Sequence, residues 1–451
     1  MQSCLFVTLG CAKNEVDTDR MRALLLNAGF GEAHDVDDAD VVLVNTCSFL
    51  ASATSESVEA TLELADDVHR GVRARPIIMC GCVPSRYGSA LEAELPEVAA
   101  FVRTSEEDQI VEVVSRVLDT EPPQAAQGRD ASASLRTVEG ASAYVKISDG
   151  CDRFCAFCAI PYIRGRYASR PADEILLEVR DLLAGGVREI VLIGQDTGVW
   201  GHDLGAGELS LAWLLRQVAR EVAPYGGWVR VLYLQPEGMT DELVATLRDV
   251  SEVLPYLDIP IQHCNERVLS SMGRSGSRRE LAELFSRLRR EIPHMVLRTT
   301  GLVGFPGETE EEFEELLDFV REQEFDYTSV FAYSREDGTR AAGMDGQVGE
   351  DERREREQRL HDVAEDLGFA ATASHVGEVV DVIIDGVDET DEGVELIGHA
   401  WFQAPDCDGA VHLACGEASV GDKVRVLLTD SFCYELEGKV VSDEDGETCG
   451  D

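Results

Sequence analysis

The sequence contains little positive charge. Of its 451 residues only 40 are lysine or arginine, against 86 aspartates and glutamates, so the formal net charge is −46. Only four residues of the whole chain are lysine: Lys13, Lys146, Lys423 and Lys439. A chain of this charge repels polyanions, and binding of nucleic acid would need a local basic groove. A GC-rich genome or a high-salt cytoplasm would give the same composition, and the sequence does not separate these causes from the choice of partner.

A long apolar stretch is also missing. No continuous run reaches the length of a membrane-spanning helix, and the first residues, MQSCLFVTLGC, lack the basic start of a secretion signal. Thirteen cysteines in such a chain indicate a reducing compartment and not a disulfide framework. We therefore predict a cytoplasmic protein without membrane contact, long enough for two or three domains.

Three cysteines stand close together in the run SDGCDRFCAFCAIP: Cys151, Cys155 and Cys158. Three thiolates can hold three irons of a cubane 4Fe–4S cluster and leave the fourth iron without a protein ligand. S-adenosylmethionine needs such an open iron to bind the cluster and be cleaved to a 5′-deoxyadenosyl radical. A zinc site would show a second Cys or His pair nearby, and a disulfide reading fails because three is odd. The spacing therefore predicts a 4Fe–4S cluster that uses S-adenosylmethionine.

Three further cysteines each follow a short apolar run. Cys11 follows LFVTLG, Cys47 follows VVLVNT, and Cys82 follows PIIMCG. Each run reads as a buried strand, so each cysteine falls at a carboxyl strand end, where open α/β sheets bind ligands. We predict a second 4Fe–4S cluster here, with ordinary buried cysteines as the alternative. Cys80 shares a strand face with Cys82 and could be a competing ligand or a mere neighbour.

The order of strand-like and helical runs predicts an α/β protein of three domains. From Tyr144 onward six strand-like runs alternate with helical ones: YVKIS, EIVLIGQD, VRVLYLQP, YLDIPIQ, VLRTTGLVG and TSVFAYS. This alternation implies parallel strands with right-handed crossovers, and six units suggest a partial (β/α)6 barrel. A long helix, roughly Glu350–Ser374, leads to short runs that suggest a small five-stranded β-barrel. The expected bounds are 1–120 for an N-terminal open α/β domain, 121–140 for a linker, 141–370 for the partial barrel, 371–440 for the β-barrel and 441–451 for an acidic tail.

Several of these motifs resemble the methylthiotransferase family of radical S-adenosylmethionine enzymes. The matching stretches, in family order over nearly the whole chain, are LGCAKNEVDTDR, NTCSF, GCVPSRYG and SDGCDRFCAFCAIPYIRGRYASRP. CAKNEVDTD, YLDIPIQHCNERVLSSMGR, LRTTGLVGFPGETEEEFEELLDFV and FAYSREDGTRAA resemble the branch that modifies a small-subunit ribosomal protein. The resemblance implies a radical barrel, a C-terminal TRAM module, two 4Fe–4S clusters, and methylthiolation of an aspartate β-carbon in ribosomal protein S-twelve. The alternative is the sister branch, which modifies an isopentenyladenosine of tRNA.

Candidate contacts to S-adenosylmethionine lie at several strand ends. Phe157 precedes the third cysteine of the loop, where the radical family commonly has an aromatic residue. The other candidates are Gln195, Asp196, Arg298, Gly304 and Gly307. The two glycines, in GLVGFPGE, resemble the strand end beside the adenine in radical enzymes, although on composition alone they could be a plain turn. No catalytic side chain beyond the cluster ligands is predicted.

The chemistry and the charge suggest the partners. The hydrogens on an aspartate β-carbon are not acidic near neutral pH, so a radical and not a side-chain base is needed. The resemblance implies a low-potential electron donor such as flavodoxin or ferredoxin. Between Ala371 and Lys439 fifteen residues are acidic and three are basic, which is opposite to a nucleic-acid module. We therefore expect the ribosomal protein, free or in the small subunit, and not tRNA, although the acidity of the whole chain is another explanation.

Overall fold

The structure is a computed structural model that describes residues 2–70, 75–121, 136, 138, 140–205, 209–390, 393–414 and 418–441. Most of the expected linker, 121–140, and of the expected acidic tail, 441–451, lies outside these residues. No helix in the described part is long and apolar enough to cross a membrane.

The chain divides into two compact units, and each is built from separate stretches of sequence. Unit 1 comprises Met1–Val138, Asp149–Ala168 and Ser334–Ala342. Unit 2 comprises Glu139–Ser148, Ser169–Tyr333 and Gly343–Asp451. These bounds differ from the expected domain bounds, because the loop with Cys151, Cys155 and Cys158 belongs to the same unit as the N-terminal sheet.

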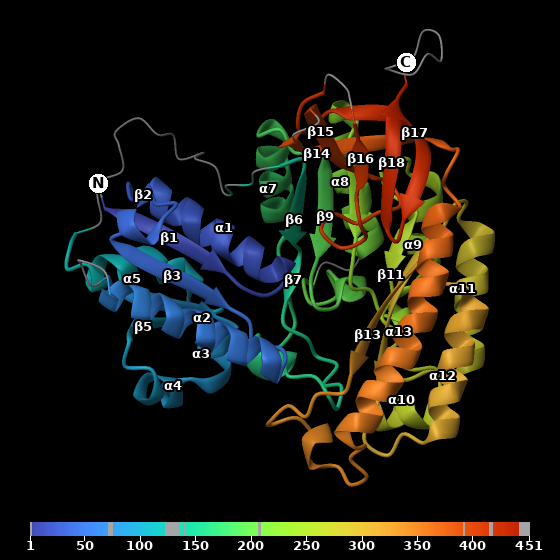
Figure 1. Cartoon of the computed structure of the whole chain (residues 1–451), viewed down its shortest axis with the longest axis horizontal. Coiled ribbons are helices and arrows are strands. Elements are labelled where there is room, and N and C mark those ends of the chain that lie inside the picture. Colours follow the sequence, from blue (N-terminus) through green and yellow to red (C-terminus); the bar gives the residue numbers. More distant parts are fainter. Residues whose placement is uncertain are drawn as a thin grey trace. The chain divides into compact units, whose positions relative to one another are not determined.

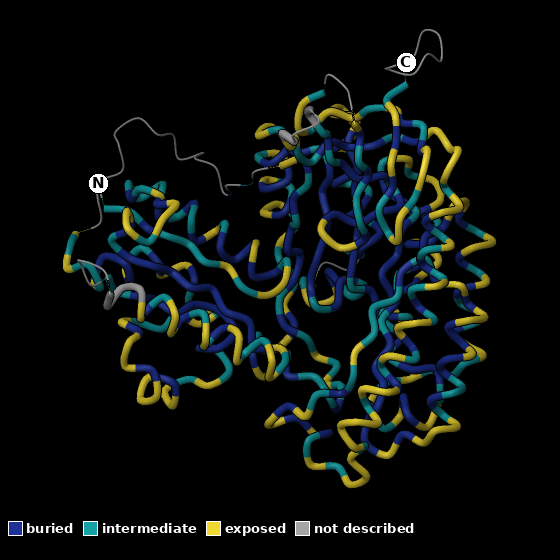
Figure 2. The backbone as a smooth tube through the Cα atoms, viewed as in Figure 1, coloured by how far each residue is buried: buried dark blue, intermediate teal, exposed yellow. Residues whose placement is uncertain are grey.

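Unit 1 contains a five-stranded parallel sheet in the order β2-β1-β3-β4-β5 (Figure 1). The strands are β1 (Ser3–Thr8), β2 (Gly31–Glu32), β3 (Val41–Thr46), β4 (Ile77–Gly81) and β5 (Val98–Arg103). The helices are α1 (Ala12–Asn27), α2 (Ala51–Arg70), α3 (Cys82–Tyr87), α4 (Ser89–Glu94), α5 (Ile110–Val117) and the short α6 (Ile160–Ile163). Every residue of β3 and β4 is buried, as expected for central strands covered on both faces (Figure 2).

Cys80 belongs to the core of this unit. It is fully buried on β4, in one apolar cluster with Cys4, Met21 and Leu25. Burial raises the pKa of its thiol well above the usual range. The structure thus places the side chain of Cys80 in the apolar core of this unit.

Unit 2 contains six parallel strands in two sheets, with the orders β10-β9-β6 and β11-β12-β13. They are β6 (Ser142–Lys146), β9 (Glu189–Ile193), β10 (Trp228–Val231), β11 (Tyr256–Asp258), β12 (Val296–Val303) and β13 (Tyr327–Ala332). A parallel bridge between Val229 and Val253, next to β11, joins the two sheets. The six strands match the six runs read from the sequence, which confirms the partial (β/α)6 barrel.

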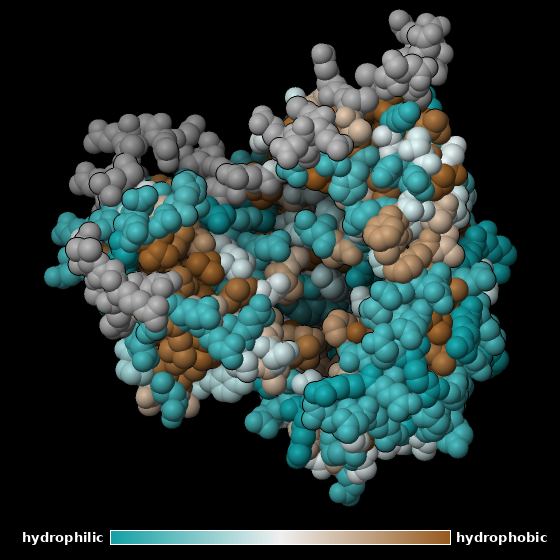
Figure 3. Space-filling view, in the orientation of Figure 1, coloured by the Kyte–Doolittle hydropathy of each residue, from teal (hydrophilic) through white to brown (hydrophobic). Residues whose placement is uncertain are grey.

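Helices alternate with these strands. They are α7 (Ala172–Ala184), α8 (Leu211–Val222), α9 (Asp241–Asp249), α10 (Glu266–Met272), α11 (Arg278–Glu291), α12 (Glu310–Gln323) and α13 (Glu350–Ala373). Thr309 and Glu312 form a capping box at the start of α12. Helix α13 confirms the long helix expected before the last domain. Figure 3 shows a largely hydrophilic face over α12 and α13.

The C-terminal strands close into a five-stranded barrel in the order β14-β15-β16-β18-β17. They are β14 (Val379–Thr390), β15 (Gly393–Ala400), β16 (Val411–Leu413), β17 (Lys423–Phe432) and β18 (Glu435–Val440). The interior is apolar and includes Val382, Leu396, Val411, Val426 and Leu436, each at most 1% exposed. Closure leaves no free sheet edge, which is how small β-domains avoid edge-to-edge association.

Candidate radical and sulfur-insertion site

Three cysteines lie together at the carboxyl edge of the N-terminal sheet. Strands β1, β3 and β4 are parallel neighbours. Cys47 and Cys82 directly follow β3 and β4, and Cys11 is the N-cap residue of α1, the helix that follows β1. A Cβ placed on Gly10, whose φ is 111°, would lie 2.6 Å from Cβ of Cys47. The loop with Cys11 therefore touches Cys47, and only glycine fits at position 10.

A buried polar network fixes the loops beside these cysteines. Nδ2 of Asn14 donates to the carbonyl of Thr46 at 2.9 Å. Nδ2 of Asn45 donates to the carbonyl of Asn14 at 2.8 Å and to Oγ1 of Thr18 at 2.9 Å. The thiol of Cys11 donates to Oδ1 of Asn14 at 3.5 Å. Because buried polar groups are costly unless they are bonded, this network locks the start of α1 onto the end of β3.

The thiols of Cys11, Cys47 and Cys82 come from three neighbouring strand ends. Among the described residues, only His361, Asp362 and Glu365 on α13 form a His/Cys/Asp/Glu trio with ligand atoms all within 4.8 Å. A cubane binds its thiolates on three separate irons, so they stand further apart than the ligands of one ion. Three thiols from three neighbouring strand ends suit that arrangement.

Burial raises the pKa of the two inner thiols. The pKa of Cys82 rises to about 11, although the nearby cation Arg164 opposes the rise. The pKa of Cys47 also rises through burial, against the effect of the backbone N–H of Phe49. Iron is bound by thiolates, so metal loading at these positions releases protons.

The second cysteine set lies on a loop enclosed by two short paired strands, β7 (Ser148–Asp149) and β8 (Ala168–Ser169). The backbone N–H of Cys158 donates to the carbonyl of Cys155 at 3.1 Å, and that of Cys151 to the carbonyl of Gly165 at 3.2 Å. Phe157 is half-buried between the second and third cysteines. These two backbone hydrogen bonds fold the short segment that carries Cys151, Cys155 and Cys158.

A buried ion pair links the segment Ser334–Ala342 to the loops of the first cysteine set. Arg86 and Glu336 lie 2.9 Å apart, with side chains 7% and 2% exposed. Arg86 also donates to the carbonyl of Ser48 at 2.8 Å, and Glu336 accepts from the backbone N–H of Ala51 at 2.8 Å. The pair therefore fixes the chain just after Cys47.

Two of the predicted cofactor contacts follow β9 in unit 2. Asp196 is 2% exposed, and Gln195 is half-buried. Oε1 of Gln195 is buried without a hydrogen-bond partner among the described residues. A buried amide oxygen of this kind suits a polar ligand at a carboxyl strand end.

Gly304 and Gly307 form a turn that follows β12. Both have positive φ, 70° and 80°, which favours glycine. The backbone N–H of Gly304 donates to Oε1 of the buried Glu308 at 2.9 Å, and Glu308 is ion-paired with Arg356 at 2.8 Å. The turn interpretation of these glycines therefore holds, and their contact with a cofactor stays a prediction.

Arg298 has a different partner from the one expected. It is the third residue of β12, near the amino end of the strand, and not at the carboxyl end. Its guanidinium is ion-paired with Asp408, which precedes β16, and donates to Ser329 at 2.9 Å. This geometry gives Arg298 a structural role in joining the two barrels of unit 2, and does not support its contact with a cofactor.

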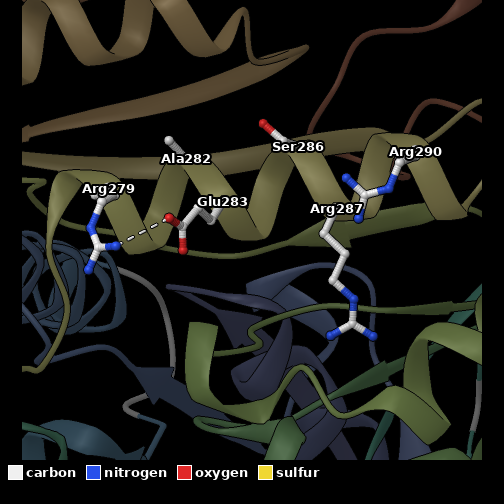
Figure 4. A pocket seen from close by; sticks show the side chains of 6 residues that line it. All are labelled: Arg279, Ala282, Glu283, Ser286, Arg287 and Arg290. Atoms are coloured by element: carbon white, nitrogen blue, oxygen red, sulfur yellow. Dashed lines mark ion pairs between the residues drawn. The ribbon is translucent and has the colours of Figure 1, made fainter.

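A shallow depression on α11 is lined by Arg279, Ala282, Glu283, Ser286, Arg287 and Arg290 (Figure 4). The exposed Arg279 and Glu283 are ion-paired along the helix at 3.5 Å. None of the predicted site residues lines this depression.

Three family models match successive parts of the chain. The uncharacterized protein family UPF0004 matches residues 3–103, the radical SAM superfamily 145–320 and the TRAM domain 376–441.

Curated relatives match almost the full length. Ribosomal protein uS12 (S-twelve) methylthiotransferase RimO of Geobacter sulfurreducens is 42% identical over 97% of this chain and 98% of its own length. The relatives of the same name from Synechococcus sp. and Symbiobacterium thermophilum are 41% and 40% identical, over 97% and 96% of this chain and 89% and 90% of theirs. The chain belongs to the ribosomal protein uS12 methylthiotransferase family. It is thus a radical S-adenosylmethionine methylthiotransferase, as its motifs predicted.

Solved structures show the fold that the methylthiotransferase shares with other radical enzymes. The radical S-adenosylmethionine methyltransferase TsrM from Kitasatospora setae, solved with cobalamin and a [4Fe-4S] cluster, aligns with a TM-score of 0.54 at 17% identity, covering 74% of this chain and 72% of that chain. The cobalamin-dependent radical enzyme OxsB aligns with a TM-score of 0.51 at 10% identity, covering 80% of this chain and 56% of that chain.

The sequence did not indicate several residues that shape the methylthiotransferase site. They are Asn14, Asn45, Arg86, Arg164 and Glu336. For Asn45 a signal was present, because a polar residue in the otherwise apolar run VVLVNT needs a buried partner. The arginines and Glu336 carried no such signal, since nothing in a charged loop distinguishes a buried ion pair from a solvated side chain.

Proposed function

We propose that this enzyme attaches a methylthio group to the β-carbon of an aspartate in ribosomal protein uS12. Full-length identity of about 40% to relatives named for that activity carries the proposal. The grouping of Cys11, Cys47 and Cys82 beside one sheet edge supports it, because sulfur insertion needs a second site besides the radical cluster.

The enzyme uses S-adenosylmethionine and two 4Fe–4S clusters. We assign Cys151, Cys155 and Cys158 to the radical cluster and Cys11, Cys47 and Cys82 to the auxiliary cluster. When bound, these cofactors supply the radical that removes an unactivated hydrogen and the sulfur that replaces it.

The chain's own side chains position and enclose these groups. The network of Asn14, Asn45 and Thr18 fixes the auxiliary cysteine loops. In our proposal the amide oxygen of Gln195 and the carboxylate of Asp196 bind the polar parts of S-adenosylmethionine. The turn at Gly304 and Gly307 lets the backbone approach the cofactor closely, and Phe157 shields the cluster from water. We propose that residues 1–120 hold the auxiliary cluster, residues 141–370 hold the radical cluster and S-adenosylmethionine, and residues 371–440 form the TRAM domain.

The partners follow from the charge and the compartment. We place the enzyme in the cytoplasm, supplied by a low-potential donor such as flavodoxin or ferredoxin. The C-terminal barrel is acidic, which favours a basic ribosomal protein and disfavours tRNA. We expect uS12 itself, free or in the small subunit, to contact this barrel.

The decisive experiment compares both candidate products in one host. A strain that lacks its own uS12 methylthiotransferase and tRNA methylthiotransferase would express this chain. Mass spectrometry would then weigh intact uS12 and the nucleosides of total tRNA. We expect one methylthio mass on the aspartate peptide and unchanged tRNA. A gain on isopentenyladenosine alone would assign the chain to the tRNA reaction, and no gain on either would refute both.

A further inference from the structure

Arg164 is a buried cation that touches a predicted cluster ligand. It follows α6, and its side chain is 2% exposed. Nη2 lies 2.9 Å from Oδ2 of Asp17 and 3.8 Å from Sγ of Cys82. Nη1 lies 3.3 Å from Oδ2 of Asp149. One guanidinium thus faces two carboxylates and a thiol.

The packing around Arg164 brings the two cysteine sets next to each other within unit 1. Cys82 forms a buried apolar cluster with Ala159, which directly follows Cys158, and with Ile163 at the end of α6. Helix α6, from the radical-cluster loop, therefore packs against α3, which begins at Cys82. Arg164 lies at the end of α6, where the loop of one predicted cluster meets a ligand of the other.

The contact with sulfur distinguishes Arg164 from a purely structural ion pair. Asp17 is 1% exposed, so its carboxylate needs a cation, and Arg164 supplies it. Neutralising Asp17 does not require Arg164 to contact Cys82, so the contact with sulfur is a separate feature. An N–H donor directed at a ligating sulfur, by contrast, stabilises the more negative state of the attached cluster and raises its reduction potential.

We propose that Arg164 is a positioning residue for the auxiliary cluster: its guanidinium donates to the Cys82 thiolate, raises the reduction potential of that cluster and holds the radical-cluster loop beside it. The inference rests on the proposed assignment of Cys11, Cys47 and Cys82 as ligands. Arg164 forms and breaks no covalent bond in this role.

The test measures the reduction potential of the auxiliary cluster in the full chain. Replacing Cys151, Cys155 and Cys158 by Ala leaves only the auxiliary cluster to load after anaerobic reconstitution. In this background we would compare Arg164→Gln, Arg164→Lys, Asp17→Asn and the double variant Arg164→Gln/Asp17→Asn. Arg22→Gln is the matched control, because it removes a cation that forms ion pairs with Asp19 and Glu32 in the same unit. Iron content and a potentiometric titration followed by electron paramagnetic resonance are the readouts.

The signs of the shifts test the proposal. Arg164→Gln should make the cluster harder to reduce by about tenfold in the reduction equilibrium, or about 59 mV for one electron. Asp17→Asn should shift the potential the opposite way, because it leaves the cation less neutralised. Adding Arg164→Gln to Asp17→Asn should again lower the potential. In this double variant position 17 is neutral, so the shift does not come from a buried carboxylate that has lost its cation. Arg164→Lys should give a smaller shift in the potential than Arg164→Gln, and Arg22→Gln should give none.

Two kinds of failure are distinguishable. If the background protein binds no cluster, the assignment of the auxiliary ligands, and with it the proposed function, is wrong. If it binds the cluster but Arg164→Gln/Asp17→Asn has the same potential as Asp17→Asn, Arg164 is only a structural partner of Asp17 and the further inference is overturned.

Discussion

His399 is a buried histidine held between two carboxylates. Its ring lies 2.7 Å from Oε2 of Glu189 and 2.6 Å from Oδ2 of Asp385, and Glu189 also accepts from Arg230 at 2.6 Å. Burial alone would lower the pKa of His399, but Glu189 and Asp385 outweigh burial and raise it to about 9. Burial alone would raise the pKa of Glu189, but Arg230 and His399 lower it to about 2. The charged pair therefore joins β15 of the C-terminal barrel to β9 of the radical barrel.

Stability should depend on pH through His399. A raised pKa in the folded state gives stability that is complete below the unfolded value, near 6.5, and is lost as the pH rises through about 9. We expect the free energy of unfolding of the native chain, relative to His399→Gln, to fall by roughly 1 kcal/mol per pH unit between about 7 and 9. Chemical denaturation of both proteins at several pH values checks this. A difference that is constant over the range would show that the ring is neutral.

Replacing a cysteine of one set should affect the two reaction products differently from replacing a cysteine of the other set. Cys155→Ala should abolish both 5′-deoxyadenosine and methylthiolated product, because the radical cluster is lost. Cys47→Ala should abolish the product and retain cofactor cleavage. Chromatography of both reaction products, with iron and sulfide analysis, is the measurement. Cys80→Ala is the control, since this core thiol should leave the iron content unchanged; full activity of either ligand variant would contradict the assignment.

At this scale the sequence predicted that Cys11, Cys47 and Cys82 lie at neighbouring strand ends, but not which side chains surround them. Each cysteine follows a recognisable pattern, either a fixed local spacing or a strand end. The partner of Arg164, in contrast, is Asp17, 147 residues away in the chain. Pairs at such a separation leave no periodic signal, so only the fold brings them into view.

Secondary-structure elements were predicted best where burial dictates their composition. Strands β9, β10 and β11 of the radical barrel were visible as apolar runs because every one of their residues is buried. Strand β16, with three residues, was not recognised, although five strands were expected. Its short sequence, VHL, has a polar histidine at its centre. It forms a strand because it pairs with β15 and β18. Tertiary contact, not local preference, forms that strand.

Two glycines of one turn should respond differently to alanine. Both have positive φ, which costs a non-glycine residue about 1 kcal/mol or more. At Gly304 an added Cβ would also lie 2.3 Å from Cγ of Arg353, whereas at Gly307 the nearest atom is 3.9 Å away. We expect Gly304→Ala to lower the free energy of unfolding more than Gly307→Ala, measured by urea denaturation. Equal losses would mean that Arg353 moves aside freely.

On the C-terminal barrel, acidic side chains stand opposite one another on paired strands, which is unfavourable for the stability of the sheet. Asp388 pairs with Glu395 across β14 and β15, and Asp430 pairs with Glu437 across β17 and β18. Like charges directly opposite one another weaken a sheet. Two such pairs on one small barrel are what a surface for a basic partner would contain.

Charge reversal on this barrel should weaken substrate binding. We expect the triple variant Asp388→Lys, Asp430→Lys and Glu437→Lys to bind uS12 at least tenfold more weakly at low salt, with the difference shrinking as salt rises. Isothermal titration or surface binding assays would measure it. Reversal of the exposed Asp351, Glu355 and Asp366 on α13 changes the net charge equally and is the control. Equal losses in both variants would attribute the binding to the overall charge.

Unit 1 ends its assembly late in translation. The ribosome delivers the sheet with Cys11, Cys47 and Cys82 first, but Arg86 gains its partner Glu336 only after most of the chain has been made. Arg164 likewise arrives long after Asp17. We therefore expect the segment with Cys11, Cys47 and Cys82 to reach its folded arrangement only after Glu336 has left the ribosome.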